Sequence, residues 1–175
     1  MRNSNAKVDT DAMIRVDHAG EYGASRIYAG QLAVMGNRSI LSGEISHMER
    51  QETAHLARFE QLLKERRVRP TLLLPVWHIA GFAVGALSAL AGEKTAMAVT
   101  AAVETEIDRH YQAQRDALDG RDPKLETSIA EFQAEELEHR DSAIAHGAQE
   151  IPAWPLLSVL VRAGCRAAIR LSERV

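Results

Sequence analysis

The sequence is poor in cysteine, in aromatic residues and in net charge. Cys165 is the one cysteine among 175 residues, which excludes an internal disulfide and any metal site built from several cysteines. A chain with so little cysteine fits a reducing compartment. The net charge of −3 argues against a general nucleic-acid-binding protein. No Gly-x-Gly-x-x-Gly stretch follows a strand pattern, so we expect no Rossmann domain.

Strand patterns are missing as well, because no segment alternates apolar and polar residues or contains a β-branched run. Alanine, leucine, glutamate and arginine are plentiful, which favours helices. We expect one all-α domain over residues 1–175, a four-helix bundle with two additional, more apolar helices. The expected helices are 11–35, 39–67, 75–90, 93–118, 123–146 and 155–172. The N-terminal MRNSNAKVDTDAM has no signal-peptide core and is not arginine-rich, so we expect that the chain either acts where it is made or has already lost a presequence.

Two of the long helices carry a Glu-x-x-His pair where hydrophobic residues are expected. In 39–67, steps of three and four residues place Glu52 and His55 on the apolar seam. That seam comprises Leu41, Ile45, Met48, Phe59 and Leu62. In 123–146, Glu136 and His139 lie on the seam formed by Leu125, Ile129, Phe132 and Ala143. Other acidic and histidine residues fall off the two seams and are predicted to be solvated. These are Glu44, His47, Glu49, Glu135 and Glu138.

Each of the other two long helices offers one acid on its seam. Glu21 precedes Glu52 by 31 residues, and Glu104 precedes Glu136 by 32. A tyrosine follows each lone glutamate by seven positions, Tyr28 in the first helix and Tyr111 in the fourth. The chain is therefore predicted to contain two similar helix pairs, each supplying one glutamate and then Glu-x-x-His.

Four buried carboxylates without counter-ions would repel one another and lose several kcal/mol each in hydration free energy. Two divalent cations would compensate them, and carboxylates with imidazoles suit iron or manganese. Two lone glutamates with two Glu-x-x-His pairs are the ligand set of ferritin-like dinuclear bundles. The alternative is a set of structural ion pairs with arginines, which a single Glu-x-x-His would favour. Two copies on core seams favour the dinuclear metal centre.

Two segments point to a membrane surface. Residues 71–91, TLLLPVWHIAGFAVGALSALA, have the length of a bilayer span but few bulky apolar residues, and they follow the basic KERRVR. In 155–172 and just beyond, arginines recur every four residues, at Arg162, Arg166, Arg170 and Arg174. We expect 71–91 to face a membrane and 155–172 to be a basic amphipathic helix on an anionic bilayer. The alternatives are a true transmembrane span for 71–91, a buried extra helix there, and a solvated surface helix for 155–172.

The sequence resembles the demethoxyubiquinone hydroxylases of ubiquinone biosynthesis, which belong to the ferritin-like superfamily. The resemblance rests on RVDHAGEYGASRIYAGQ, RVRPTLLLPVWHIAGFAVGA, AVETEIDRHY, EELEHRD and AGCRAAIRLSERV. It implies a di-iron monooxygenase of the EC 1.14 class that uses O2 to hydroxylate a prenylated benzoquinol, converting demethoxyubiquinol to demethylubiquinol. It places the family's iron ligands on Glu21, Glu52, His55, Glu104, Glu136 and His139.

The resemblance also implies NADH as reductant, a role for His110 and Tyr111 in passing electrons, and a lipid-binding accessory protein. It implies a peripheral membrane location, on the cytoplasmic face of a bacterial inner membrane or the mitochondrial matrix face. From its position, Tyr111 contacts substrate, hydrogen-bonds a ligand or is an ordinary core tyrosine. His18 is predicted to pack in the core rather than support a ligand, and Asp108 is a weaker candidate to orient a histidine.

Three further functions remain open from the sequence, together with the oligomeric state. A ferritin-type protein would oxidise and store iron, a manganese catalase would evolve oxygen from peroxide, and a non-enzymatic scaffold would only organise quinone-synthesis enzymes. Gly81 and Gly85 permit close helix contact and suggest a homodimer or a partner protein.

Overall fold

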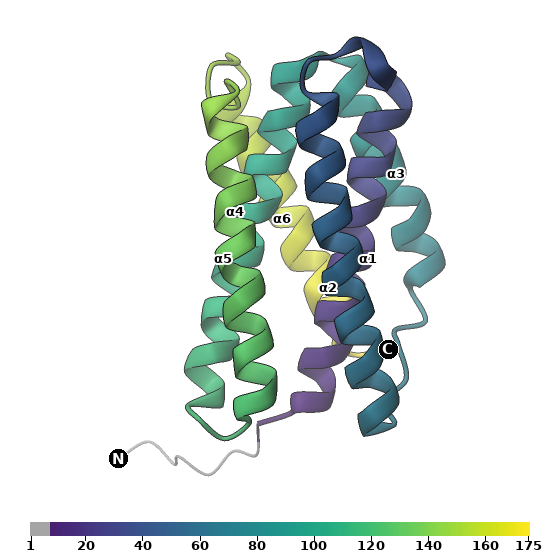
Figure 1. Ribbon diagram of the computed structural model, residues 1–175, viewed down its shortest axis with the longest axis vertical. Coiled ribbons are helices and arrows are strands. Elements are labelled where there is room, and N and C mark those ends of the chain that lie inside the picture. Colours follow the sequence, from purple (N-terminus) through teal and green to yellow (C-terminus); the bar gives the residue numbers. More distant parts are fainter. Residues whose placement is uncertain (1–7) are drawn as a thin grey trace.

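The computed structural model describes residues 8–175, which form six α-helices and one short 3-10 helix (Figure 1). They are α1 (Thr10–Met35), η1 (Gly36–Arg38), α2 (Ser42–Arg66), α3 (Leu74–Leu90), α4 (Glu93–Leu118), α5 (Pro123–Ala145) and α6 (Trp154–Ser172). The all-α prediction is confirmed. The part of the N-terminal targeting prediction that falls on residues 1–7 lies outside the described residues.

The helix ends follow from side chains in the sequence. Asp9 caps α1 by accepting a hydrogen bond from the Ala12 amide, and Asp122 caps α5 in the same way from Leu125. Pro123 occupies the first turn of α5, as predicted. The largest difference from prediction is at α2, which begins at Ser42 rather than at 39, because η1 and an extended Ser39 intervene.

The bundle consists of two antiparallel helix pairs, α1 with α2 and α4 with α5 (Figure 1). The additional helices lie outside these pairs, with α3 packed on α1 and α6 packed mainly on α4. This is the four-helix arrangement with two extra helices that was predicted, consistent with a ferritin-like bundle.

A polar layer divides the core into two hydrophobic clusters. One cluster is formed around Met35, Ile45 and Met97, and the other around Ile14, Phe59 and Leu125. On each long helix, the predicted metal ligands lie in sequence between the residues that contribute to the two clusters. The acids and histidines therefore occupy a buried layer enclosed by apolar packing at both ends.

Glycines bring α3 into backbone contact with α1. A Cβ atom added to Gly85 would lie 1.9 Å from the carbonyl oxygen of Ile27, and one added to Gly30 would lie 2.2 Å from that of Phe82. A Cβ atom on Gly81 would lie 2.8 Å from the carbonyl oxygen of Gly23. Gly81 and Gly85 therefore do not indicate a dimer or a partner protein, because both glycines serve packing between α3 and α1 within the chain.

None of the helices within residues 8–175 combines the length and the apolar character that crossing a bilayer requires.

Candidate metal centre

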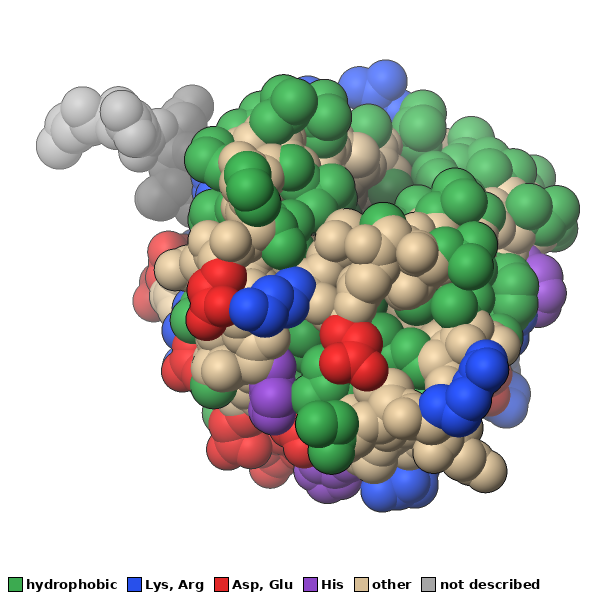
Figure 2. Space-filling model, turned by 90° about the horizontal axis from the view of Figure 1, so that it is seen from above, with side chains coloured by type: hydrophobic (Ala, Val, Ile, Leu, Met, Phe, Trp, Pro, Cys, Tyr) green, Lys and Arg blue, Asp and Glu red, His purple; other side chains and the backbone are tan. Residues whose placement is uncertain are grey.

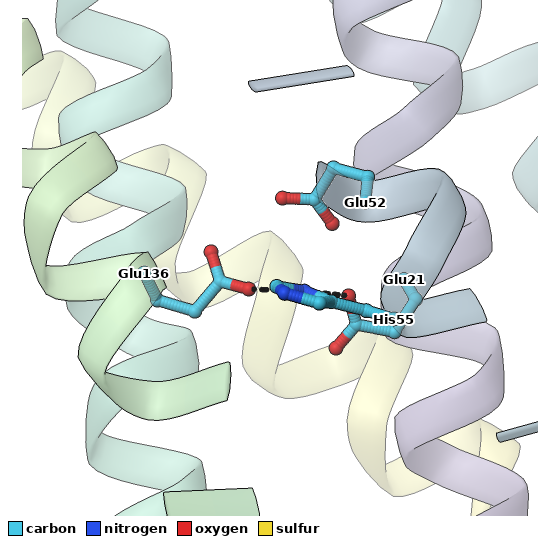
Figure 3. A group of neighbouring side chains, drawn as sticks. All are labelled: Glu21, Glu52, His55 and Glu136. Atoms are coloured by element: carbon cyan, nitrogen blue, oxygen red, sulfur yellow. Dashed lines mark hydrogen bonds and ion pairs between the residues drawn. The ribbon is translucent and has the colours of Figure 1, made fainter. Parts of the chain in front are cut away.

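All six predicted ligands converge in the polar layer, which is closed to solvent. Glu52 and Glu136 are 0% exposed, Glu21, His55 and Glu104 are 1% exposed, and His139 is 2% exposed. Their side chains point toward one another from four different helices, as Figure 3 shows for one half of the group. Burying this many ionisable side chains together is costly unless their charges are compensated.

The six side chains form two overlapping groups of potential metal ligands. Glu21, Glu52, His55 and Glu136 make one group, and Glu52, Glu104, Glu136 and His139 make the other. Within each group, the ligand atoms lie within 4.8 Å of one another. Glu52 and Glu136 belong to both groups, so each is a candidate ligand for either of two ions.

In both histidines, Nδ1 is the ring nitrogen that faces the carboxylates. His55 Nδ1 lies 3.2 Å from a Glu21 oxygen and 3.1 Å from a Glu136 oxygen. His139 Nδ1 lies 3.2 Å from the other Glu136 oxygen and 3.4 Å from Glu52. Nδ1 is therefore the atom that each ring presents to an ion between the helices.

The acids are poorly satisfied by the protein itself. Within residues 8–175, neither oxygen of Glu52 nor Oε2 of Glu104 has a hydrogen-bond partner. Burial, together with neighbouring carboxylates, raises the pKa of Glu52 and of Glu104 well above the usual value of 4.5. These orphaned buried oxygens fit a site that receives cations, because a divalent ion would compensate both acids.

Glu136 and His55 behave as an ion pair in the metal-free protein. Burial opposes ionisation of Glu136, but hydrogen bonds from His139 and His55 lower its pKa to about 2. Burial likewise opposes protonation of His55, but Glu136 and Glu21 raise its pKa to about 10. Protons thus balance charge here in the absence of metal, and a cation that bound at this point would displace them.

The two buried tyrosines cross between the helix pairs. Tyr28 of α1 donates a 2.6 Å hydrogen bond to Glu104 of α4, and Tyr111 of α4 donates to Glu21 of α1. Burial and nearby carboxylates raise the pKa of both tyrosines well above 10, so both stay protonated and act as donors. Of the predicted alternatives for Tyr111, the structure contains the hydrogen bond to a candidate ligand.

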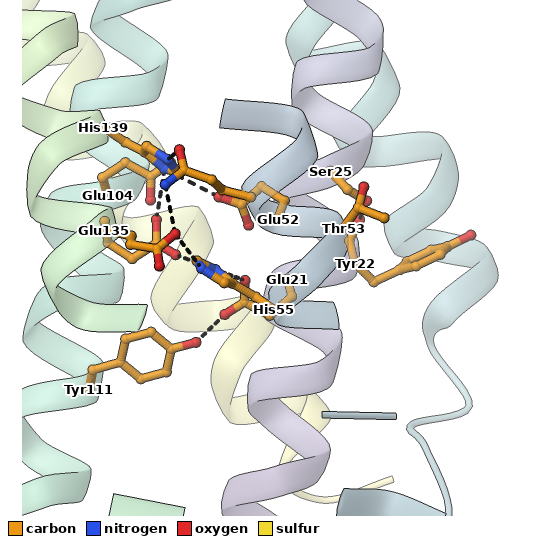
Figure 4. A network of polar contacts seen from close by, with 12 residues as sticks. Glu21, Tyr22, Ser25, Glu52, Thr53, His55, Glu104, Tyr111, Glu135 and His139 are labelled. Atoms are coloured by element: carbon orange, nitrogen blue, oxygen red, sulfur yellow. Dashed lines mark hydrogen bonds and ion pairs between the residues drawn. The ribbon is translucent and has the colours of Figure 1, made fainter. Parts of the chain in front are cut away.

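Glu135 was predicted to be solvated, and that prediction is only partly met, because its carboxylate also contacts His55 and Gln51. Its side chain is 37% exposed, and Oε2 lies 3.2 Å from His55 Nε2 (Figure 4). Gln51, which the seam test did not consider, lies with Oε1 3.0 Å from His139 Nε2. The search for acids and histidines on the apolar face of each helix missed both residues. It considered one helix at a time and left out contacts made across to another helix. Each of these residues precedes a shared glutamate in the chain and reaches the histidine of the opposite helix.

The remaining predicted residues lie outside the ligand layer. His110 Nε2 lies 3.2 Å from Oδ1 of the buried Asp17. Asp108 accepts a 2.7 Å hydrogen bond from Gln133 and lies 4.0 Å from Arg140, so the suggestion that it orients a histidine is wrong. His18 is buried, and its Nδ1 has no hydrogen-bond partner in the described chain, which agrees with the packing role.

An apolar cavity of about 480 Å³ lies beside the centre, enclosed by α1, α3, α4 and α6. Its wall includes Gly20 and Val103, the immediate chain neighbours of Glu21 and Glu104. Trp77 from α3 and Cys165 from α6 also line it. A molecule in this cavity would be surrounded by hydrophobic side chains and would lie next to residues that neighbour Glu21 and Glu104 in the chain.

Residues 8–172 match the model of the family described as ubiquinone biosynthesis protein COQ7. The chain belongs to the COQ7 family. The match covers the four bundle helices, α3 and α6, and so includes every residue of the centre and the cavity.

Individual COQ7-family relatives are similar over nearly the whole chain. A Rhodospirillum rubrum protein named 3-demethoxyubiquinol 3-hydroxylase is 54% identical over 165 residues, covering 94% of this chain and 78% of its own. A human protein named NADPH-dependent 3-demethoxyubiquinone 3-hydroxylase, mitochondrial, is 48% identical, covering 97% and 80%. A Saccharomyces cerevisiae protein named 5-demethoxyubiquinone hydroxylase, mitochondrial, is 38% identical, covering 94% and 78%.

Proposed function

We propose that this chain is a single-domain monooxygenase that hydroxylates the ring of demethoxyubiquinol, a prenylated benzoquinol, in ubiquinone biosynthesis. The observation that carries the proposal is a buried carboxylate and histidine centre with an apolar cavity directly against its wall. The names of the relatives support the same reaction. An apolar cavity suits a prenylated ring better than any soluble substrate.

The proposed cofactor is a pair of iron ions. Glu21 and His55 would hold one ion and Glu104 and His139 the other, with Glu52 and Glu136 shared between them. The ligand set fits, because the buried acids lack partners of their own and carboxylates with imidazoles suit iron. When bound, iron supplies the activation of dioxygen that the hydroxylation requires.

The protein's part in the reaction is to position the quinol ring and to keep water away from it. Small residues on α1, Gly20 and Ala24, open the cavity wall beside Glu21, and Val103 and Ile107 of α4 form the facing side. The ring is placed at this wall, with the prenyl tail along α3 and α6. Tyr28 and Tyr111 hold the carboxylates of Glu104 and Glu21 in fixed orientations throughout.

The overall reaction consumes two electrons and two protons. A ring C–H bond and O2 become a ring hydroxyl group and one water molecule. We propose a reduced nicotinamide as the electron source. The resemblance implied NADH, whereas the names of the mammalian relatives specify NADPH for those proteins. Both donors therefore belong in any assay, and the contribution of His110 and Tyr111 to electron transfer can be tested with each.

We also propose that α3 and α6 rest on a membrane surface, where the substrate resides. Exposed apolar side chains on these helices include Ile79 at 71%, Leu87 at 65% and Leu156 at 65%. Figure 2 shows hydrophobic side chains gathered along one side of the molecule and acidic ones on the opposite side. This location would be the cytoplasmic face of a bacterial inner membrane or the mitochondrial matrix face, and a lipid-binding accessory protein could share it.

The deciding experiment supplies iron-loaded protein with demethoxyubiquinol, oxygen and a reductant, and analyses the ring products by mass spectrometry. We expect a hydroxylated ring that carries one oxygen atom from ¹⁸O2. The Glu136→Ala variant should fold and give no product, because it lacks a shared ligand. A folded variant with full activity would refute the site assignment.

The same experiment separates the alternatives. A ferritin-type protein would oxidise iron without needing the quinol, and a manganese catalase would evolve oxygen from peroxide. A scaffold would form no product with any reductant. The cavity favours the hydroxylase over all three, since none of them needs an apolar chamber beside the metal ligands.

A further inference from the structure

One short chain of hydrogen bonds holds both proposed histidine ligands from behind. Glu135 Oε2 lies 3.2 Å from His55 Nε2 and accepts a 2.7 Å hydrogen bond from Gln51 Nε2. Gln51 Oε1 lies 3.0 Å from His139 Nε2. This series of three hydrogen bonds therefore crosses between α2 and α5 three times, beside the carboxylate layer (Figure 4).

The direction of each hydrogen bond follows from the chemistry of the groups. A carboxylate only accepts, so Gln51 must turn its NH2 group to Glu135 and its carbonyl oxygen to His139. Both Nε2 atoms then face acceptors, so each ring carries a proton on Nε2. In the metal-bound protein, this leaves Nδ1 of both rings free to bind an ion on the side of the carboxylates.

We propose that Glu135 and Gln51 make the two metal positions unequal, so that the position at His55 binds a divalent cation more tightly than the position at His139. This inference rests on the proposed metal centre. The two positions have the same types of candidate ligand. Each has one terminal glutamate held by a tyrosine of the opposite helix pair, and both share Glu52 and Glu136. Behind the histidines, one position has a carboxylate and the other an amide.

The physical reason is the charge of the acceptor. A carboxylate that accepts the Nε2 proton makes Nδ1 a stronger donor to metal and places a further negative charge near the cation. A neutral amide orients the ring but adds neither effect. Phe132 stacks on His55 with ring centroids 4.0 Å apart, which fixes the plane of that ring without adding charge. Removing the hydrogen-bond acceptor behind a metal-binding histidine typically weakens metal binding by about 10- to 100-fold.

The test is a calorimetric titration of the metal-free protein with Co²⁺. We expect two binding steps in the wild type. The isosteric Glu135→Gln variant should weaken the tighter step by at least about tenfold, so that the two steps merge. The exchange variant Gln51→Glu with Glu135→Gln should restore two steps. Glu138→Gln is the matched control, since it removes an equal charge from an exposed position on the same helix and should titrate like the wild type.

Anomalous scattering from crystals holding one equivalent of Co²⁺ identifies which position fills first. We expect the His55 side in the wild type and the His139 side in the exchange variant. Two equal steps in the wild type, a first ion at His139, or a Glu135→Gln titration identical to the control would overturn the inference. Failure of the wild type to bind Co²⁺ at all would instead refute the metal centre, so the two failures are distinguishable. Circular dichroism establishes that each variant folds.

Discussion

At the scale of single residues, Tyr28 and Tyr111 are two matching polar links between the two halves of the bundle. Each is 1% exposed and donates its hydroxyl proton to a glutamate of the other helix pair. Because Tyr28 is seven residues beyond Glu21 and Tyr111 seven beyond Glu104, the crossing is reciprocal. Both terminal carboxylates are thereby fixed by the same device, from opposite directions.

Replacing either tyrosine by phenylalanine should therefore have similar effects. Tyr111→Phe leaves a Glu21 oxygen buried without its donor, which costs about 1–3 kcal/mol of unfolding free energy. Tyr28→Phe removes the equivalent donor from Glu104 and should cost a similar amount. Urea unfolding of the metal-free proteins measures both. A loss confined to one variant would contradict the equivalence of the two contacts.

The charge state of the centre predicts how the stability of the metal-free protein depends on pH. The folded-state pKa values of Glu52 and Glu104 are raised above 4.5 by burial, and that of His55 is raised from 6.5 to about 10. A raised pKa contributes stability that is present below the unfolded-state value and lost as the pH rises through the folded-state value. The lowered pKa of Glu136 acts in the opposite direction only below about 4.5.

The melting temperature of the metal-free protein should consequently fall between pH 5 and pH 9. Metal should reverse the trend, because binding requires deprotonated ligands and strengthens as protons leave. Thermal unfolding followed by circular dichroism at several pH values, with and without Fe²⁺ under anaerobic conditions, measures this. A metal-free protein that gains stability over the same range would contradict the assigned pKa shifts.

A residue of the centre could be predicted when its position follows from the pattern of its own helix. It could not be predicted when its role is a contact with another helix. Glu52, His55, Glu136 and His139 were predictable because they interrupt an apolar seam, which is a property of one helix. Glu135 was not, since it lies off its own seam and acts across the gap on a histidine of α2. Contacts between helices depend on how the helices are placed, and the spacing within one helix carries no information about that.

At the scale of helices, the packing of α3 depends on glycine. Gly85→Ala should destabilise the protein by about 1–3 kcal/mol, because the added methyl group would collide with the backbone of Ile27 and push α3 away from α1. Gly43→Ala is the matched control, since a Cβ atom there meets nothing within 4 Å. That control should be neutral or stabilising by up to about 1 kcal/mol. Chemical denaturation compares the two.

The expectation for α6 is only partly met. Arg162 and Arg166 do not lie free on a positive stripe, because both hydrogen-bond to Glu106 of α4, at 3.0 and 2.8 Å. Glu106 is 4% exposed, so this double contact anchors the middle of α6 to the bundle. Arg170 and Arg174 remain exposed. The four-residue repeat identified the stripe, but only the position of α4 determines which arginines are engaged.

At the scale of the whole molecule, the apolar side formed by α3 and α6 predicts binding to membranes. We expect the protein to float with vesicles that contain anionic lipid. A variant with Ile79→Gln and Leu87→Gln should bind them several-fold less, because both side chains are more than half exposed. Ile40→Gln is the matched control, since Ile40 is 93% exposed but lies between α1 and α2. Equal flotation of all three proteins would contradict the assignment of this side.

The size of the cavity limits how much of the prenyl chain the enzyme can recognise. At about 480 Å³ it lies in the lower half of the usual range for small-molecule pockets, enough for a ring and the first part of an isoprenoid chain. The remaining units would extend beyond the protein into lipid. Such an enzyme would not discriminate between prenyl chains by their number of isoprene units, so one active site would accept quinols with tails of different lengths. The prenyl chain that the host synthesises would then determine which quinol is modified.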